Sequence, residues 1–321
     1  MNNGMFIISL DFELYWGIFE KSTISDKKVY FNNTIKTIPR ILKRFEKYEI
    51  EATWATVGFL FFESIKQLKQ NLPEKIPVYH NNKVSAFNYI DNSYDDFYKQ
   101  YHFAPDIIQL INNTVGQEIA SHTLSHYYCL EPGQTPETFY ADLKKNIDLA
   151  KQSGINIKSL VFPRNQYNPA YEKIVKLAGI TAIRSNPDIW FWDANRKENI
   201  WKKIFRTADA YIPLFNSSFK LSDNKELPLK IPASRFLRPL SKYKILNKLR
   251  IIRIKKEMTY AAKTNKIYHL WWHPHNFGYY PETALSELDE ILKHYKTLKQ
   301  KYNFSSINMR NIYQKNIKSK S

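Results

Sequence analysis

Apolar runs of strand length alternate along the chain with longer segments of helical character. The run FIISL precedes a helix-like stretch over 31–48, and EATWATV precedes one near 59–69. The alternation continues with EIASH and a helix over 135–152, then with SLVFP and a helix over 169–177. The last runs are ITAIRS, then IYHLWWH with a helix near 281–301, then FSSINM. This α/β pattern predicts about seven parallel strands joined by crossover helices.

Either an open doubly wound sheet or a closed barrel satisfies this alternation, because the sequence does not show whether the sheet closes. In both folds we expect functional side chains at the carboxyl ends of strands. Two stretches, 70–103 and 186–258, interrupt the alternation and are predicted to be insertions over one rim of a single domain spanning 1–314. The polar residues 315–321 are expected to form a flexible tail.

Composition limits the class of protein. Of the 321 residues, 43% are hydrophobic and 15% aromatic, as in folded globular proteins. FIISL is short and follows no basic leader, so it predicts a strand and not a signal peptide. No apolar run is long enough to span a bilayer, so any membrane contact is expected to be peripheral. A single cysteine, Cys129, excludes an intramolecular disulfide framework and favours a reducing compartment, so a cytoplasmic location is expected.

The formal charge of +18 favours polyanionic partners such as nucleic acid, anionic lipid or phosphate-linked substrates, although it also serves solubility. The 49 aromatic residues could stack on bases, but they cluster around the predicted strands and no nucleic-acid motif is present, so nucleic acid is not expected.

The segment 230–256 has ten basic residues and no acid. These residues are Lys230, Arg235, Arg238, Lys242, Lys244, Lys248, Arg250, Arg253, Lys255 and Lys256. Interleaved Leu and Ile predict an amphipathic helix over 241–256. It is interpreted either as a surface facing anionic headgroups on the inner face of a membrane or as a solvated basic helix with a packed apolar face.

Two acids end the first predicted strand. Asp11 and Glu13 are two residues apart, so on a strand both side chains point from the same face and their carboxylates converge. Burial of two unpaired carboxylates is costly, which suggests a cation or a basic side chain nearby. The alternative is that the two acids begin a solvated loop.

Two histidines follow a later strand. His122 and His126 are four residues apart in EIASHTLSHYYCLE, which puts both rings on one face of a helical turn. Two imidazoles and one carboxylate form a common ligand set of catalytic zinc, with the fourth position left for water. The alternative is a structural pair. Because both the acids and the histidines follow apolar strands, they could meet at one rim.

Four motifs together resemble the polysaccharide deacetylase family, the NodB-like carbohydrate esterases. The family pattern has an acidic pair, H-[ST]-x-x-H, an arginine motif and a late L-x-x-H-P. Here these read SLDFE, HTLSH, FPRNQ and LWWHP, in the family's order over residues 9–274. The resemblance implies a distorted (β/α)7-type barrel and metal-dependent hydrolysis of the amide of an acylated sugar.

The resemblance also implies roles for the acids and histidines. Asp11 is expected to be the catalytic base, and Glu13, His122 and His126 are expected to hold Zn²⁺ or another divalent transition metal. The family more often has adjacent aspartates, whereas Phe12 separates the two acids here. Asp11 and Glu13 could therefore exchange roles.

Two further catalytic residues follow from the resemblance. Arg164 in FPRNQ is similar to the family arginine that orients the base, and its charge would hold Asp11 ionised. His273 in LWWHP resembles the general acid that protonates the leaving amine. His275 could replace His273 or bind substrate.

The remaining candidates are substrate-binding residues. His269, Trp271 and His273 share one face of an extended strand, which gives an imidazole beside an aromatic wall suited to sugar rings. Asp188 and Trp190 in SNPDIW resemble a family motif in which an acid braces the arginine and a Trp lines the site. The full set expected to bind substrate is Trp16, Tyr167, Asp188, Trp190, Trp271 and His275.

The expected substrate is a nucleotide-linked or lipid-phosphate-linked acylated sugar of surface polysaccharide or glycolipid biosynthesis. The expected reaction is removal of an N-acetyl group. Two alternatives are deformylation of a lipid-linked formamido sugar and a catalytically inactive carbohydrate-binding relative.

Overall fold

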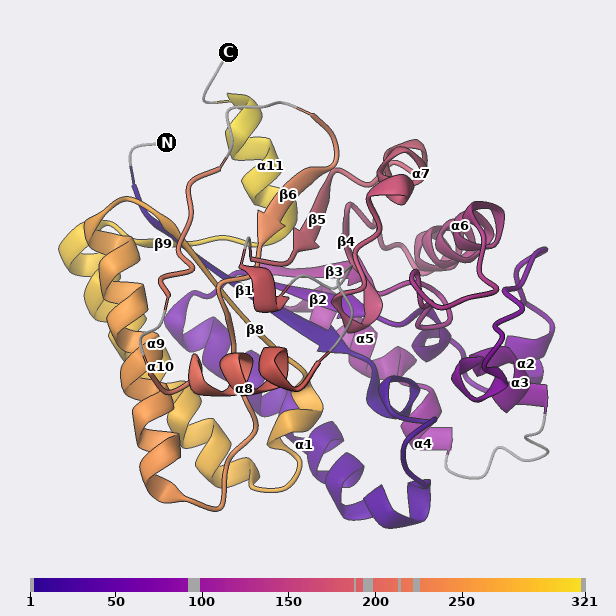
Figure 1. Cartoon of the computed structure of the whole chain (residues 1–321), viewed down its shortest axis with the longest axis horizontal. Coiled ribbons are helices and arrows are strands. Elements are labelled where there is room, and N and C mark those ends of the chain that lie inside the picture. Colours follow the sequence, from indigo (N-terminus) through magenta and orange to yellow (C-terminus); the bar gives the residue numbers. More distant parts are fainter. Residues whose placement is uncertain are drawn as a thin grey trace.

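The computed structural model describes residues 3–91, 99–187, 189–192, 199–212, 215–221 and 226–318. Its strands form one parallel sheet in the order β6-β5-β4-β3-β2-β1-β8-β7, with β9 paired to the start of β1 (Figure 1). The strands are β1 Met5–Phe12, β2 Ala52–Thr56, β3 Gln117–Ser121, β4 Ser159–Val161, β5 Ala182–Ser185, β6 Leu229–Pro232, β7 Arg235–Phe236, β8 Ile267–Trp272 and β9 Ser305–Ser306.

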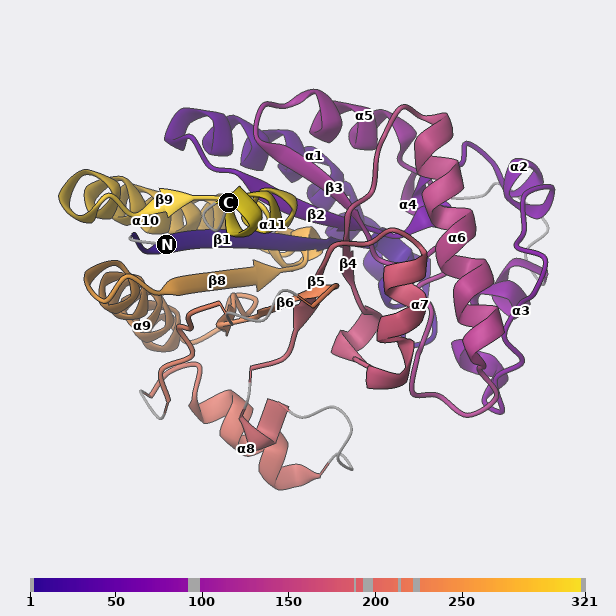
Figure 2. The ribbon, with the colours of Figure 1, turned by 90° about the horizontal axis from the view of Figure 1, so that it is seen from above.

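Helices surround this sheet, which curls into an incomplete barrel (Figure 2). They are α1 Ile24–Tyr48, α2 Ile65–Lys69, α3 Ala86–Asp91, α4 Lys99–His102, α5 Pro105–Asn113, α6 Pro136–Gln152, α7 Glu172–Leu177, α8 Ile200–Ala208, α9 Lys244–Lys263, α10 Pro281–Tyr302 and α11 Met309–Lys318. No helix in the described part of the chain is long and apolar enough to cross a membrane. The predicted distorted (β/α)7-type barrel is confirmed.

All seven predicted strands are present, and two more, β6 and β7, lie inside the stretch 186–258 that was predicted to be an insertion. Both are short, so their sequences give little alternation. The helix predicted near 59–69 is only α2 with a preceding 3-10 turn, because the N–H groups of Gly58 and Phe59 donate to the loop after β3. Helix α11 continues to Lys318, into the segment expected to be a tail.

The alternation of side chains along β1 divides the core in two. Phe6, Ile8, Leu10 and Phe12 pack against the surrounding helices in the larger cluster. The intervening residues face the inside of the barrel, where Met5 and Ile7 join a smaller cluster that includes residues of α11. Further along the same inner row come Ser9, Asp11 and then Glu13. The barrel interior is thus apolar at its base and polar at the carboxyl ends of the strands.

Candidate metal centre and active site

Side chains from four strands meet at the polar end of the barrel. Asp11 lies on β1 and Glu13 follows it, His122 directly follows β3, Arg184 lies on β5, and His273 directly follows β8. Parallel strands end at the same edge of a sheet, so residues far apart in the chain converge there. Four of these five residues were predicted from the sequence; Arg184 was not.

The carboxylate of Glu13 lies between two imidazoles. Its Oε1 is 3.1 Å from His122 Nε2 and 3.3 Å from His126 Nε2. His122 Nδ1 lies 2.8 Å from the carbonyl oxygen of Val161, which can only accept, so Nδ1 donates this hydrogen bond and Nε2 is the ring nitrogen that faces Glu13. The hydroxyl of Tyr128 lies 3.1 Å from His126 Nδ1. In each ring the nitrogen that faces away from Glu13 thus has a polar partner that fixes the ring's orientation, as in metal-ligating histidines.

This donor set fits a zinc ion. Tetrahedral zinc with nitrogen and oxygen ligands at about 2.1 Å requires ligand atoms about 3.4 Å apart. The measured separations of 3.1 and 3.3 Å agree with that spacing. Burial raises the pKa of Glu13, but His273, His126 and His122 outweigh burial and hold this pKa well below its ordinary value. Glu13 is therefore ionised, as a ligand must be.

A glycine makes room for the Glu13 carboxylate. Glu13 precedes a 3-10 turn, Leu14–Gly17, that folds back over it. A Cβ placed on Gly17 would overlap the Glu13 carboxylate. Any larger residue at position 17 would therefore displace Glu13.

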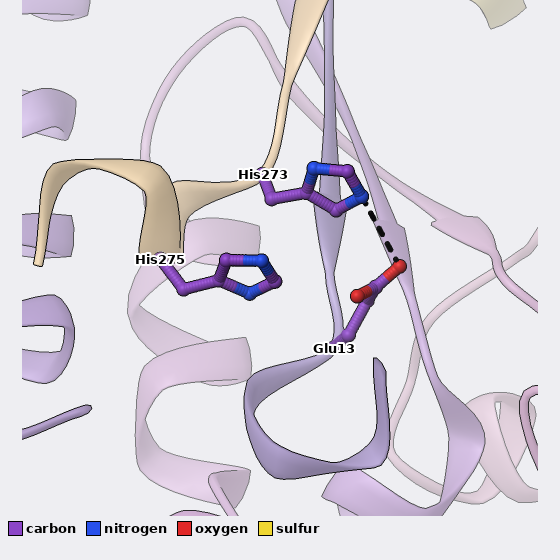
Figure 3. Close-up of side chains that lie close together, drawn as sticks. All are labelled: Glu13, His273 and His275. Atoms are coloured by element: carbon purple, nitrogen blue, oxygen red, sulfur yellow. Dashed lines mark ion pairs between the residues drawn. The ribbon is translucent and has the colours of Figure 1, made fainter. Parts of the chain in front are cut away.

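A second group of donors shares Glu13. His273 Nε2 is 3.5 Å from Glu13 Oε1, and the His273 and His275 rings stack with centroids 4.8 Å apart (Figure 3). The Nδ1 atoms of His273 and His275 are buried, and neither has a hydrogen-bond partner among the described residues. These two rings lack the outer hydrogen bonds that orient His122 and His126. The set Glu13, His122 and His126 is therefore the better candidate for a metal centre.

The loop that presents the two histidines is strained and braced. Thr123 and His126 have φ angles of 62° and 57°, in the left-handed region that a β-branched residue such as threonine rarely adopts. Asp142, buried on α6, accepts hydrogen bonds from the backbone N–H groups of Leu124 and Ser125 and from the Ser125 hydroxyl. This bracing holds the imidazoles in place.

Arg184, and not Arg164, holds Asp11. Arg184 Nη1 and Nη2 donate to the two oxygens of Asp11 at 2.6 and 2.7 Å, a bidentate pair inside the barrel. Burial raises the pKa of Asp11, but Arg184, His122 and His273 together lower it below its ordinary value. Asp11 is thus kept as a carboxylate, which suits a proton acceptor.

The prediction that Arg164 orients Asp11 is therefore wrong. Arg164 lies in a turn beyond β4 with φ 53°, and its guanidinium pairs with Glu20 and stacks 4.1 Å from the ring of Tyr128. Position 184 lies on β5 itself, in the inward-facing row that also contains Ala182, so its side chain enters the barrel where Asp11 lies.

Besides Asp11, two polar side chains accept hydrogen bonds from Arg184. Its Nη2 donates to Asn165 Oδ1 at 2.9 Å, and its Nη1 donates to Ser9 Oγ at 3.1 Å. The Ser9 hydroxyl is also 2.8 Å from Nε2 of His269. Burial and the charge of Arg184 lower the pKa of His269 to about 3, so His269 is a neutral partner in this network.

His273 faces both acids. Its Nε2 is 3.8 Å from Asp11 Oδ2, and Trp271 lies beside it with ring centroids 5.7 Å apart. Burial lowers the pKa of His273, but Glu13 and Asp11 outweigh burial and raise it. The indole of Trp271 also lies under the Arg184 guanidinium, 4.3 Å from its ring centroid. Trp271 therefore lies between His273 and Arg184, on the inward face of β8.

The other predicted substrate-binding residues lie in different environments. Trp16 is fully buried and donates its indole N–H to the carbonyl of His102 at 2.7 Å, so it belongs to the core and not to the site. Tyr167 is half-buried and packs on Phe162. Trp190 is 41% exposed and packs on aromatic residues of its own region. Asp188 lies outside the described residues.

Comparison with known proteins supports the family suggested by the motifs. The family model described as polysaccharide deacetylase matches residues 28–183. This range includes His122 and His126, whereas Asp11, Glu13 and His273 lie outside it. Among curated proteins, no sequence matches this chain. The predicted relationship to polysaccharide deacetylases is confirmed.

Solved structures share the fold. A putative polysaccharide deacetylase from Mycobacterium smegmatis aligns with a TM-score of 0.63 at 12% identity, over 99% of this chain and 92% of that one. A probable polysaccharide deacetylase from Pseudomonas aeruginosa PAO1 aligns with a TM-score of 0.56 at 10% identity, over 98% and 90%. A 4-alpha-glucanotransferase from Thermococcus litoralis aligns with a TM-score of 0.55 at 14% identity, over 98% of this chain and 40% of that one. Proteins with this fold thus have different activities, so the fold alone does not determine the reaction, which depends on the residues of the site.

Proposed function

We propose that this protein is a metal-dependent deacetylase that removes an N-acetyl group from a sugar during synthesis of a surface polysaccharide or glycolipid. The observation that supports it is the convergence of Glu13, His122 and His126 on one point beside the ionised carboxylate of Asp11. The three donors would hold Zn²⁺ or another divalent transition metal.

The chain's own residues supply the base. Zinc, when bound, acts as a Lewis acid toward an acyl oxygen and lowers the pKa of water to about 7. Asp11 accepts the proton of the attacking water, because Arg184 keeps its carboxylate charged and fixed in orientation. Arg184 thus acts through Asp11 as a positioning residue.

His273 supplies the acid. An amine leaves an amide readily only when its nitrogen gains a proton. His273 lies next to Asp11 and Glu13, and the two carboxylates raise its pKa, which favours the protonated ring. Nε2 of His273 donates that proton to the leaving amine, while the Trp271 ring beside it offers an apolar surface for a sugar.

The phosphate-linked carrier remains part of the proposal. Within 230–256, Arg235, Arg250 and Arg253 are buried in ion pairs with Asp209, Glu257 and Glu287, so they do not face solvent. The exposed lysines of the segment are Lys230, which pairs with Glu172, and Lys242, Lys244, Lys248 and Lys256. The last four lie in or next to α9. We propose that these lysines contact anionic headgroups, which would place the enzyme at the inner face of the membrane.

A metal-content assay paired with acetate release tests the proposal. His122→Ala should lose bound metal, measured by elemental analysis, and should lose release of acetate from UDP-N-acetylglucosamine and from a lipid-phosphate-linked N-acetylglucosamine. His80→Ala, at an exposed histidine outside the site, is the matched control and should keep both. Full activity in protein stripped of metal would contradict the proposal.

A further inference from the structure

Helix α8 presents its apolar side to solvent. Ile200, Trp201, Ile204 and Phe205 recur at helical spacing along one stripe, and they are 64%, 62%, 48% and 37% exposed. Ile212, just beyond the helix, is 56% exposed. Burial of such side chains normally stabilises a helix against its own protein. Here Phe205, at one edge of the stripe, packs on Trp190 and Phe191, whereas Ile200, Trp201 and Ile204 are largely exposed.

The polar side of α8 faces the protein instead. Lys202 is only 3% exposed, and Asp209, which ends the helix, is 1% exposed. Asp209 pairs with Arg235 at 2.7 Å and with Arg253 of α9 at 3.2 Å. Arg238 donates to the carbonyl of Arg206 at 2.9 Å. Buried ion pairs and hydrogen bonds therefore fix the helix in an orientation in which the described part of the chain leaves Ile200, Trp201 and Ile204 largely exposed.

The surroundings of α8 are strongly basic. The described parts of 199–256 contain fourteen Lys and Arg residues, and their acids are Asp209 and Glu226. Five of the fourteen are paired with acids and add little to the field; these are Lys230, Arg235, Arg250, Arg253 and Lys255. Asp209 is neutralised by its buried partners. Lys203 on α8 is exposed, as are Lys242 and Lys244 at the start of α9. An apolar stripe with lysines around it matches an anionic lipid surface, where the apolar side enters the acyl boundary and the lysines meet headgroups.

Helix α8 also lies near the rim of the catalytic site. Figure 2 shows it standing apart from the sheet, on the side of β5, β6 and β8. Arg206 of α8 lies over the ring of Trp192, 5.7 Å from its centroid. Trp192 and Trp271 line one small cavity, and Trp271 adjoins His273. A surface that docks through α8 would therefore lie close to the catalytic groups.

We propose that α8 is a membrane-docking helix that inserts Ile200, Trp201 and Ile204 into the interface of an anionic bilayer. This inference rests on the proposed function, because docking would bring the active site to a lipid-phosphate-linked substrate in the membrane. Docking itself needs no substrate, so it is measured on vesicles that contain none.

Vesicle sedimentation tests the inference. The wild-type protein should pellet with vesicles of phosphatidylglycerol and phosphatidylcholine, and far less with phosphatidylcholine alone. The double variant Trp201→Ser, Ile204→Ser should lower the partition coefficient roughly 30-fold, because two apolar side chains no longer insert. The matched control, Val115→Ser with Leu177→Ser, alters two apolar residues elsewhere that are 86% and 79% exposed, and should bind like wild type.

A second pair of variants separates the two proposals. Lys242→Glu with Lys244→Glu should weaken binding by more than tenfold and reduce its salt dependence, if the lysines act as headgroup contacts. The Trp201→Ser, Ile204→Ser variant should still release acetate from soluble UDP-N-acetylglucosamine like wild type, so failure of docking and failure of the deacetylase proposal are distinguishable.

Three results would overturn the docking helix. The first is wild-type protein that does not pellet with anionic vesicles. The second is a Trp201→Ser, Ile204→Ser variant that binds as tightly as wild type. The third is a wild-type dimer in analytical ultracentrifugation that this variant dissociates while neither protein binds vesicles, which would make a second copy of the chain the occupant of the stripe.

Discussion

Arg184 on β5 donates hydrogen bonds across the inside of the barrel to both carboxylate oxygens of Asp11 on β1, although three strands lie between β5 and β1 in the sheet. The pair is buried, and Ser9 and Asn165 hold the arginine from two sides. Both the charge and the orientation of the proposed base therefore depend on a residue from another strand.

Replacing Arg184 should damage catalysis through Asp11. We expect Arg184→Met to lower kcat/KM by roughly 10²- to 10³-fold, since a misplaced base loses most of its effect. Without the arginine the Asp11 pKa rises, so the acidic limb of the pH profile should move to higher pH. Arg184→Lys keeps a charge but not the bidentate geometry. It should therefore restore the position of the acidic limb more fully than it restores kcat/KM. The measurement is kcat/KM against pH.

Arg164 provides the comparison for that experiment. It pairs with Glu20 and does not contact Asp11. Arg164→Met should leave the acidic limb where it is and change kcat/KM by less than about tenfold, as expected of a residue outside the acid–base chemistry. If Arg164→Met moved the limb and Arg184→Met did not, the assignment of the two arginines would be reversed.

The sequence predicted those site residues that lie within a few positions of each other on one strand or in one loop. Asp11 and Glu13 share a strand face, and His122 and His126 share a short loop, so neighbouring positions disclosed each pair. The Arg184 contact was invisible because it depends on how far the sheet curls, which no local pattern encodes. One signal was available: in ITAIRS a lone arginine interrupts an apolar strand, and a buried arginine needs a carboxylate partner.

The environment of single aromatic residues was harder to predict. Trp271 lies on the same face of β8 as His269 and alternates with Leu270 and Trp272, which pack against the helices, so its place followed from strand geometry. Trp16 lies in a 3-10 turn, where no simple period separates inside from outside, and the structure buries it. The two interpretations of the basic segment 230–256 could not be separated from the sequence, because the acids that pair with three of its arginines come from other parts of the chain or lie just beyond the segment: Asp209 directly after α8, Glu257 on α9 and Glu287 on α10.

His273 should matter most when the leaving group is a poor one. We expect His273→Asn to lower kcat by roughly 10²- to 10⁴-fold on an N-acetyl sugar, because the amine can no longer take its proton from the ring. An aryl acetate ester releases a stable phenolate, so its hydrolysis should fall far less. Both rates are measured on protein whose metal content has been confirmed equal to wild type.

The pH profile gives a second test of His273. Neighbouring carboxylates raise its pKa, so the ring stays protonated at low pH and loses its proton as pH rises through that value. Wild-type kcat should therefore decline on the alkaline side, and His273→Asn should lack that decline. Loss of bound metal in the variant would instead place His273 in the metal centre with Glu13 and His275.

Asp142 should control metal affinity without touching the metal. Its carboxylate accepts three hydrogen bonds from the loop between His122 and His126, two of them from backbone N–H groups. In Asp142→Asn one oxygen becomes an NH₂ group that faces a donor, which should cost about 1–3 kcal/mol of stability. The strained loop would then relax, and metal affinity should fall roughly 10- to 100-fold, as for other outer-sphere changes.

Ser125→Ala is the matched control for Asp142, because it removes the hydroxyl hydrogen bond and leaves both backbone hydrogen bonds. It should lower metal affinity much less than Asp142→Asn does. Competition with a chromophoric chelator measures the affinity, and thermal unfolding of the metal-free proteins measures the stability. Equal metal affinity in wild type and Asp142→Asn would show that the loop keeps its shape without the carboxylate, and that the left-handed residues Thr123 and His126 are held by their other contacts.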